Sequence, residues 1–160
     1  MSVAKVREYL RAKGLEERIS EFAVSSATVE LAAQAVGVEE ARIAKTLSFI
    51  VDEKPVLIVC AGDTKVDNPR YKAQFHAKAK MIPFDEAEAL VGHAPGGVCP
   101  FALPEGVRTY LDESLRRFDT VYPAAGSAAS AVKLAPDELE HAAQNFAGWI
   151  DVCKGWRENE

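Results

Sequence analysis

The feature that most constrains this chain is a pair of apolar segments separated by a short polar turn. Residues 46–51 and 55–60 each have the length and residue types of a β-strand, and Asp52-Glu53-Lys54 between them is typical of a hairpin turn. The second segment is almost continuously apolar, which indicates a central strand that is buried on both faces. We therefore expect a sheet with this hairpin at its centre.

Helix and strand signals surround the hairpin in no regular order. Capping residues and apolar periodicity predict helices over residues 2–13, 28–37, 68–76 and 85–91 and after Pro136. Short strands are predicted near residues 108–111, 120–122, 131–134 and 149–152. Because no strand–helix–strand repeat appears, the pattern favours a single α+β domain with a mixed β-sheet flanked by helices. We expect this domain to span residues 1–155, followed by a polar tail at residues 156–160.

Composition limits the kind of protein further. A chain of 160 residues, 48% of them hydrophobic, is long enough for one core and short for two. No apolar run approaches the ~18 residues that cross a bilayer, and the N-terminus becomes charged at once, so we expect a cytoplasmic protein without a membrane partner. The three cysteines, Cys60, Cys99 and Cys153, are odd in number and widely spaced. That pattern predicts neither a disulfide framework nor a metal site.

The charge distribution leaves room for a local contact with nucleic acid. A net charge of −5 argues against a general nucleic-acid-binding surface. One stretch, however, holds five basic residues against the single acid Asp67, namely Lys65, Arg70, Lys72, Lys78 and Lys80. This group either touches an RNA backbone or is a solvated face, and the sequence does not favour one of the two. The basic residues near the N-terminus are interpreted as a solvated face.

A glycine loop over residues 92–101 is the first candidate for a site. Gly96 and Gly97 are adjacent and are bracketed by Pro95 and Pro100, so the backbone is stiff and carries no side chain. A ligand can then lie directly against backbone N–H groups, which is one way to bind an oxyanion without a metal. The loop lacks both the P-loop pattern and the dinucleotide fingerprint. Considered alone it is more simply a tight turn, although an ordinary turn needs no proline on both sides.

Lys45 is the second candidate. It lies between a short helical stretch at residues 39–44 and the first strand of the hairpin, where it is either a solvated lysine or a fixed point charge. As a point charge it would hold a phosphate or polarise a carbonyl. No serine or cysteine lies in a recognisable triad, since His76, His93 and His141 stand in unrelated contexts.

Several segments together resemble a known family. They are Thr28-Val29-Glu30-Leu31-Ala32-Ala33, Ile43-Ala44-Lys45-Thr46-Leu47, Ala61-Gly62-Asp63, the glycine loop through Phe101, and Ala125-Gly126. In order and spacing they resemble the YbaK/EbsC family of aminoacyl-tRNA deacylases, which is related to the editing domain of bacterial prolyl-tRNA synthetase. The resemblance covers residues 22–139 and implies a partly barrel-like sheet.

The resemblance implies a metal-independent enzyme without a cofactor. It would hydrolyse the ester that joins a wrong amino acid to the 3′ end of a tRNA, with prolyl-tRNA synthetase as a second partner. The family's lysine corresponds to Lys45, and its Gly-x-x-x-Pro loop corresponds to residues 96–100, from Gly96 and Gly97 to Pro100. The amides of Gly96 and Gly97 would then stabilise the oxyanion, while Lys45 holds the terminal phosphate or the carbonyl oxygen. A bound water would attack, helped by the ribose hydroxyl.

The substrate side of this site is less defined. Phe22 and Thr28 are expected to shape the amino-acid pocket, although a core residue and a helix cap explain them equally well. Pro95, Gly126 and Ser127 are further expected substrate-binding residues.

Two departures from the family pattern leave the amino acid open. Residues 126–132 contain no acid, and residues 21–26 lack the Tyr and His of cysteine-editing members. We expect a small amino acid such as Cys or Ala on tRNA-Pro. The alternative is a non-catalytic module of the same fold that recognises an acylated 3′ end, a nucleotide or a synthetase, and a third option is hydrolysis of a small ester unrelated to tRNA.

Overall fold

The apolar hairpin forms the centre of the molecule, as predicted. In the computed structural model, which describes residues 2–23 and 28–157, β2 (Ile43–Val51) pairs antiparallel with β3 (Lys54–Ala61). Asp52 and Glu53 form the two-residue turn with positive φ angles of 52° and 66°. Every residue of β3 from Val56 to Ala61 is fully buried, which confirms the prediction of a central strand.

The main sheet is mixed and has the order β6-β2-β3-β5-β8. The added strands are β5 (Arg108–Asp112), β6 (Tyr122–Pro123) and β8 (Phe146–Ile150). β6 runs parallel to β2, while β5 runs parallel to both β3 and β8, so only the hairpin pair is antiparallel. This single α+β domain with a mixed sheet is the predicted fold class.

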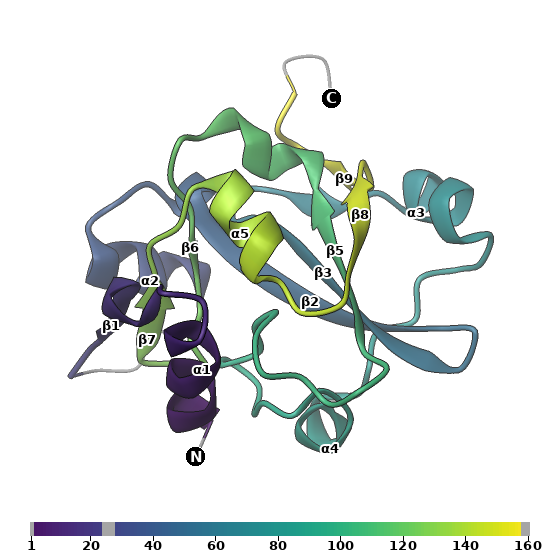
Figure 1. Cartoon of the computed structure of the whole chain (residues 1–160). Coiled ribbons are helices and arrows are strands. Elements are labelled where there is room, and N and C mark those ends of the chain that lie inside the picture. Colours follow the sequence, from purple (N-terminus) through teal and green to yellow (C-terminus); the bar gives the residue numbers. More distant parts are fainter. Residues whose placement is uncertain (1, 24–27, 158–160) are drawn as a thin grey trace.

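Helices and two small ribbons complete the domain (Figure 1). β1 (Ile19–Glu21) pairs with β7 (Ser130–Val132), and β4 (Lys65–Val66) pairs with β9 (Cys153–Lys154). Figure 1 shows α1 (Ser2–Arg11) and α2 (Val29–Val36) beside the β1–β7 ribbon, with α3 (Asn68–Phe75) at the opposite end of the sheet. α4 (Ala87–Val91) and α5 (Pro136–Ala142) follow later in the chain.

Side chains of β3 pack on both faces of the sheet. Val59 and Ala61 belong to the cluster that includes Leu139 of α5, whereas Ile58 and Cys60 belong to the cluster that includes Tyr71 of α3. Alternate residues of one strand therefore hold two layers together, as the period of a β-strand dictates.

The predicted helices form, with local differences. α2 begins after Thr28, whose hydroxyl accepts a hydrogen bond from the Leu31 amide, and ends at Gly37 in the left-handed conformation. α2 buries only Ala33, whereas Leu31 and Ala35 are exposed. The last long strand, β8, begins at Phe146 rather than near residue 149.

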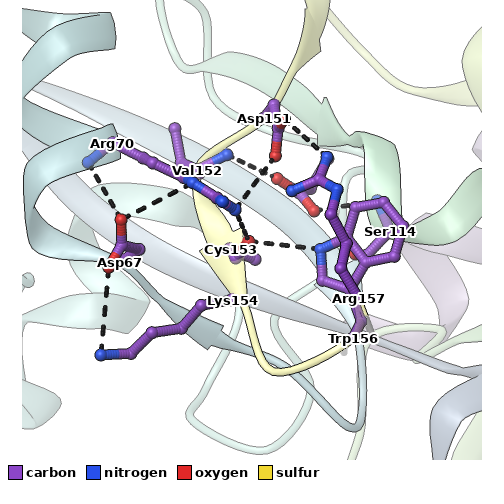
Figure 2. Close-up of polar contacts among 10 residues, drawn as sticks. Asp67, Arg70, Ser114, Asp151, Val152, Cys153, Lys154, Trp156 and Arg157 are labelled. Carbon is purple, nitrogen blue, oxygen red and sulfur yellow. Dashed lines mark hydrogen bonds and ion pairs between the residues drawn. The ribbon is translucent and has the colours of Figure 1, made fainter. Parts of the chain in front are cut away.

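Polar contacts attach the C-terminal strand to the rest of the domain (Figure 2). The Asp67 amide donates to the Val152 carbonyl at 2.7 Å, and the Arg70 guanidinium donates to the Cys153 carbonyl at 2.8 Å. The Trp156 indole also donates to the Cys153 carbonyl, at 3.2 Å. The contacts of this strand therefore include Trp156, and residues 158–160 lie outside the described part.

In the described ranges, no helix is long and apolar enough to cross a membrane.

Candidate functional site

A cavity lies beside the outer edge of β2, the edge that does not face β3. On this edge, β6 pairs with β2 only at Ile43 and Ala44. Further along β2, the chain around Met81 forms two backbone hydrogen bonds with it: the Ile50 amide donates to the Lys80 carbonyl, and the Ile82 amide donates to the Ser48 carbonyl. Between these attachments, the β2 edge at residues 45–47 has no partner strand in the described part of the chain. A cavity of about 560 Å³ lies here, between the strand edge, α2 and the glycine loop.

The cavity lining is apolar or small apart from six polar side chains. These are Thr28, Lys45, Thr46, Ser48, Tyr122 and Ser130. None of the described lining residues is Asp, Glu, His or Cys. The described lining therefore offers hydroxyl groups and one lysine, but no carboxylate, imidazole or thiol side chain.

The sequence had placed Lys45 between a helical stretch and a strand. In the structure it is the third residue of β2. It lies opposite Cys60 in the hairpin register, and its amino group donates to the Thr64 carbonyl. Thr64 is itself fixed, since its hydroxyl donates to the Ala61 carbonyl at 2.7 Å. The lysine is thus held by a tight turn at the end of β3.

The turn over residues 61–64 is braced on two sides. A Cβ atom on Gly62 would lie 2.1 Å from the Glu40 carbonyl oxygen, so only glycine fits there. Asp63 forms a two-pronged ion pair with Arg117, with distances of 2.6 and 3.0 Å. The segment Ala61-Gly62-Asp63 therefore positions Lys45 without itself lining the cavity.

The glycine loop contains a tight turn. The Gly97 amide donates to the Ala94 carbonyl at 3.0 Å, and Gly96 has a φ of +91°, so Pro95 and Gly96 occupy the central positions of a type II turn. The Gly97 amide is consequently occupied, and Gly97 does not line the cavity. Gly96 and Val98 line the cavity, and their amides donate no hydrogen bond within residues 2–23 and 28–157.

Gly97 has a packing reason to be glycine. A Cβ atom there would lie 2.6 Å from the carbonyl carbon and oxygen of Gly126 and 2.7 Å from the Cα of Ser127. Gly97 therefore allows two backbones to approach closely, and it does not supply the oxyanion-binding amide that the resemblance implied. Gly126 and Ser127 lie directly behind the loop.

A buried polar cluster supports the loop from behind. The His93 imidazole contacts the Phe101 carbonyl through Nε2 at 2.7 Å, and the Cys99 sulfur lies 3.5 Å from the same nitrogen. His93 Nδ1 has no hydrogen-bond partner among the described residues. Burial lowers the pKa of His93, which keeps its ring neutral. Burial also raises the pKa of the Cys99 thiol to about 12, so Cys99 is not an activated nucleophile.

The structure brings together four of the nine predicted site residues at the cavity: Lys45, Thr28, Pro95 and Gly96. Pro100 is buried, and its carbonyl accepts from the Gln144 amide at 2.8 Å. Phe22 bonds through its amide to the Ala129 carbonyl and does not line the cavity. Residues 24–27 of the segment compared with cysteine-editing members, including Ser25 and Ser26, lie outside the described residues.

Sequence reasoning missed several lining residues. Thr46, Ser48, Tyr122 and Ser130 supply hydroxyl groups, while Met81 and Phe84 form part of the wall. The signal for the first two was present, because Thr46 and Ser48 stand two positions apart in the strand and their hydroxyl groups therefore lie on the same face of β2.

The fold and the cavity define a class of protein: a small α+β domain whose site combines one anchored lysine with glycine-turn amides that have no partner among the residues described. The model of the aminoacyl-tRNA editing domain matches residues 24–142. The chain belongs to this family of editing domains.

One relative spans nearly the whole length of the chain, and two others match about two thirds of it. YwhH of Bacillus subtilis, an uncharacterised protein, is 46% identical over 157 residues, which cover 98% of this chain and 99% of YwhH. EbsC of Enterococcus faecalis, named as a candidate Cys-tRNA(Pro)/Cys-tRNA(Cys) deacylase, is 30% identical over 114 residues and 70% of each chain. A segment of the Leuconostoc citreum proline–tRNA ligase is 33% identical over 101 residues, which are 62% of this chain and 17% of the ligase.

A solved structure shares the fold. It is described as that of a candidate trans-editing enzyme for prolyl tRNA synthetase, and it superimposes with a TM-score of 0.86 at 28% identity, covering 96% of this chain and 98% of the other. The predicted resemblance to the deacylase family and to prolyl-tRNA synthetase editing domains is confirmed.

Proposed function

We propose that this protein deacylates mischarged tRNA without a metal ion and that its first substrate is tRNA-Pro carrying Cys or Ala. The observation that carries the proposal is the placement of Lys45 and the unpaired amides of Gly96 and Val98 around one cavity. Membership of the editing-domain family supports the substrate class. The proposal places the reaction in the cytoplasm, where aminoacyl-tRNAs are made and used.

The reaction needs a site for developing negative charge. When water adds to the ester carbonyl, the carbonyl oxygen becomes an oxyanion that amide donors at a glycine turn can stabilise. Gly96 and Val98 supply such amides in the proposed mechanism, in place of the predicted pair Gly96 and Gly97. The C–O ester bond then breaks, the ribose oxygen takes up a proton, and the amino acid leaves as a carboxylate.

Lys45 has the positioning role. A lysine amino group is a compact point charge that suits a phosphate or a carbonyl oxygen. Since the Thr64 carbonyl accepts one of its N–H groups, the remaining donors can serve the terminal phosphate or the ester carbonyl. Because no described lining residue is a carboxylate or histidine, we assign the activation of water to the ribose hydroxyl of the substrate.

The lining favours a small amino acid. Ala32, Ala44 and Ala124 form part of the wall, and the Thr46 hydroxyl is buried without a hydrogen-bond partner among the described residues. An unsatisfied hydroxyl is costly unless a ligand group meets it. We therefore assign Thr46 to contact a polar atom of the aminoacyl group.

The test is release of free amino acid from a panel of mischarged tRNAs, with and without prolyl-tRNA synthetase and with and without a chelator. Release from Cys- or Ala-tRNA-Pro that a chelator does not affect is expected. Loss of activity with the chelator would contradict the metal-free mechanism. Tight binding of the charged tRNA without any release would instead favour the non-catalytic module.

A further inference from the structure

The segment between α3 and α4 is drawn in teal in Figure 1, and three of its residues, Met81, Ile82 and Phe84, line the cavity. Phe84 and Met81 are 79% and 56% exposed, and both line the cavity. Side chains of this size seldom stay in water without a partner when they stand together at the mouth of a site. Lys78 and Lys80 precede them in the same segment and are also exposed.

The backbone beneath these side chains is fixed. The Ile50 amide donates to the Lys80 carbonyl at 2.8 Å, and the Ile82 amide donates to the Ser48 carbonyl at 3.0 Å. Ile82 itself is buried in a core cluster with Leu57. The segment therefore presents Lys80, Met81 and Phe84 from a backbone that is anchored to β2.

Lys78 and Lys80 differ from Arg70, another member of the predicted Lys65–Lys80 group, in what their side chains contact. Arg70 bonds to the Cys153 carbonyl and forms ion pairs with Asp67 and Asp151 (Figure 2). Within the described part of the chain, Lys78 and Lys80 have no ion pair or hydrogen bond from their side chains. In a protein with a net charge of −5, these two lysines make the segment that carries the exposed Phe84 ring locally positive.

We propose that Lys78, Lys80, Met81 and Phe84 form a track for the unpaired 3′ strand of the RNA. Single-stranded RNA is held by aromatic side chains that stack on bases and by basic side chains that follow the phosphates. In this arrangement, a base near the 3′ end stacks on Phe84 at the cavity mouth, and the preceding phosphates lie against Lys80 and Lys78. The inference rests on the proposed function for the identity of the RNA.

The direction of the track follows from the charges. Asp85, Glu86 and Glu88 are exposed on the chain that follows Phe84 and would repel phosphates. The strand is therefore expected to leave the cavity toward Lys80 and Lys78, away from α4. This path answers the question that the sequence left open, because it assigns part of the Lys65–Lys80 group to RNA and part to the fold.

The test measures binding of an uncharged single-stranded RNA oligonucleotide ending in CCA, by fluorescence anisotropy at several salt concentrations. Phe84→Ala should weaken binding by about 5- to 150-fold, the range that loss of one base stack gives, with an unchanged salt dependence. The double variant Lys78→Ala/Lys80→Ala should lower the slope of log K against log salt by roughly 1.4, since each phosphate contact on a single strand contributes about 0.7. The matched control Lys13→Ala/Lys133→Ala removes two exposed lysines elsewhere and should leave the slope unchanged.

Two results would overturn the track. One is binding of both variants as tightly as the wild-type protein, or no binding of the oligonucleotide by the wild-type protein. The other is a fall in the rate of deacylation by Phe84→Ala that is equal for a mischarged tRNA and for a 3′-aminoacyl adenosine. Since the adenosine lacks the preceding nucleotides, Phe84 would then act only as a cavity wall. Since the oligonucleotide carries no amino acid, its binding is measured independently of whether the protein is a deacylase.

Discussion

β2 and β3 are neighbours in one hairpin and have similar lengths, but they have different tasks. β3 is paired along both edges, and its residues from Val56 to Ala61 are fully buried. In the described part of the chain, β2 is paired at the ends of its outer edge and open between them; the open part carries Lys45 and Thr46, and Ser48 follows where the pairing resumes. The strand that stabilises the core and the strand that carries the candidate site are therefore neighbours, about 4.8 Å apart.

The largest expected effect on stability lies in β3. Ile58 is fully buried in the cluster on the α3 face, so Ile58→Ala removes apolar contacts and leaves a cavity. The free energy of unfolding should fall by about 2–5 kcal/mol, measured by urea denaturation. The rate of deacylation by the protein that remains folded should change little. A loss below about 1 kcal/mol would contradict the assignment of β3 as the structural strand.

The second effect lies in the glycine loop that faces the open edge of β2. In Gly97→Ala the new methyl group would meet the Gly126 and Ser127 backbones, so the loop must shift. We expect a loss of about 1–3 kcal/mol in unfolding free energy, as for other overpacked sites, together with a large loss of activity. Gly106→Ala is the control, because nothing lies within 4 Å of that Cβ position and only the positive φ of 92° opposes it. If both variants keep full activity, the loop is an ordinary turn.

The third effect is a pH dependence from His93, behind the loop. Burial lowers the pKa of His93 in the folded state, so the unfolded chain binds the proton more tightly. This contribution to stability is present above the unfolded pKa of about 6.5 and is lost as the pH falls toward the folded value. One such group gives a slope of at most about 1.4 kcal/mol per pH unit.

Denaturation curves at pH 7.5, 6.5 and 5.5 for the wild-type protein and His93→Gln measure this slope. The amide of Gln can still donate to the Phe101 carbonyl but cannot titrate, so the variant should lose the part of the slope due to His93. Parallel pH profiles for the two proteins would show that His93 does not couple protonation to the loop.

The smallest effect on stability is expected in β2. Thr46→Val keeps the shape of the side chain and removes a buried hydroxyl that has no partner among the described residues. The free energy of unfolding should stay constant or rise by about 1 kcal/mol, while deacylation becomes slower. If Thr46→Val is destabilised but deacylates at the normal rate, Thr46 serves stability rather than the site, which would contradict the assignment of β2.

The sequence predicted the strand pair because apolar runs and a polar turn are local signals. It also predicted the caps of α2 at Thr28 and Gly37, since capping depends on a few adjacent residues. The type II turn that occupies the Gly97 amide also has a local signal, Pro95-Gly96, whereas the contact of Gly97 with Gly126 could not be predicted because it depends on how two distant loops meet. Phe22 was misplaced for the same reason, as its position depends on pairing with the chain at Ala129.

Met81 and Phe84 were missed because they follow no motif. They stand at the two ends of a short apolar run, Met81-Ile82-Pro83-Phe84, that gives no strand or helix period, and only the bonding of Lys80 and Ile82 to β2 brings them to the cavity. Lys45 was found through a resemblance, whereas its anchoring by the Thr64 carbonyl comes from the turn at the end of β3.

The most direct test of the account is the rate of deacylation of Cys- and Ala-tRNA-Pro by Lys45→Ala under single-turnover conditions, with unfolding measured on the same preparation. The account predicts a fall of about 100-fold or more, the size seen when a single charge-stabilising donor is removed from an active site. It also predicts an unfolding free energy within about 1 kcal/mol of the wild-type value, because Lys45 lies on the open part of β2. A Lys45→Ala protein that releases the amino acid at the wild-type rate would contradict the central claim that this lysine and the glycine turn form one catalytic site.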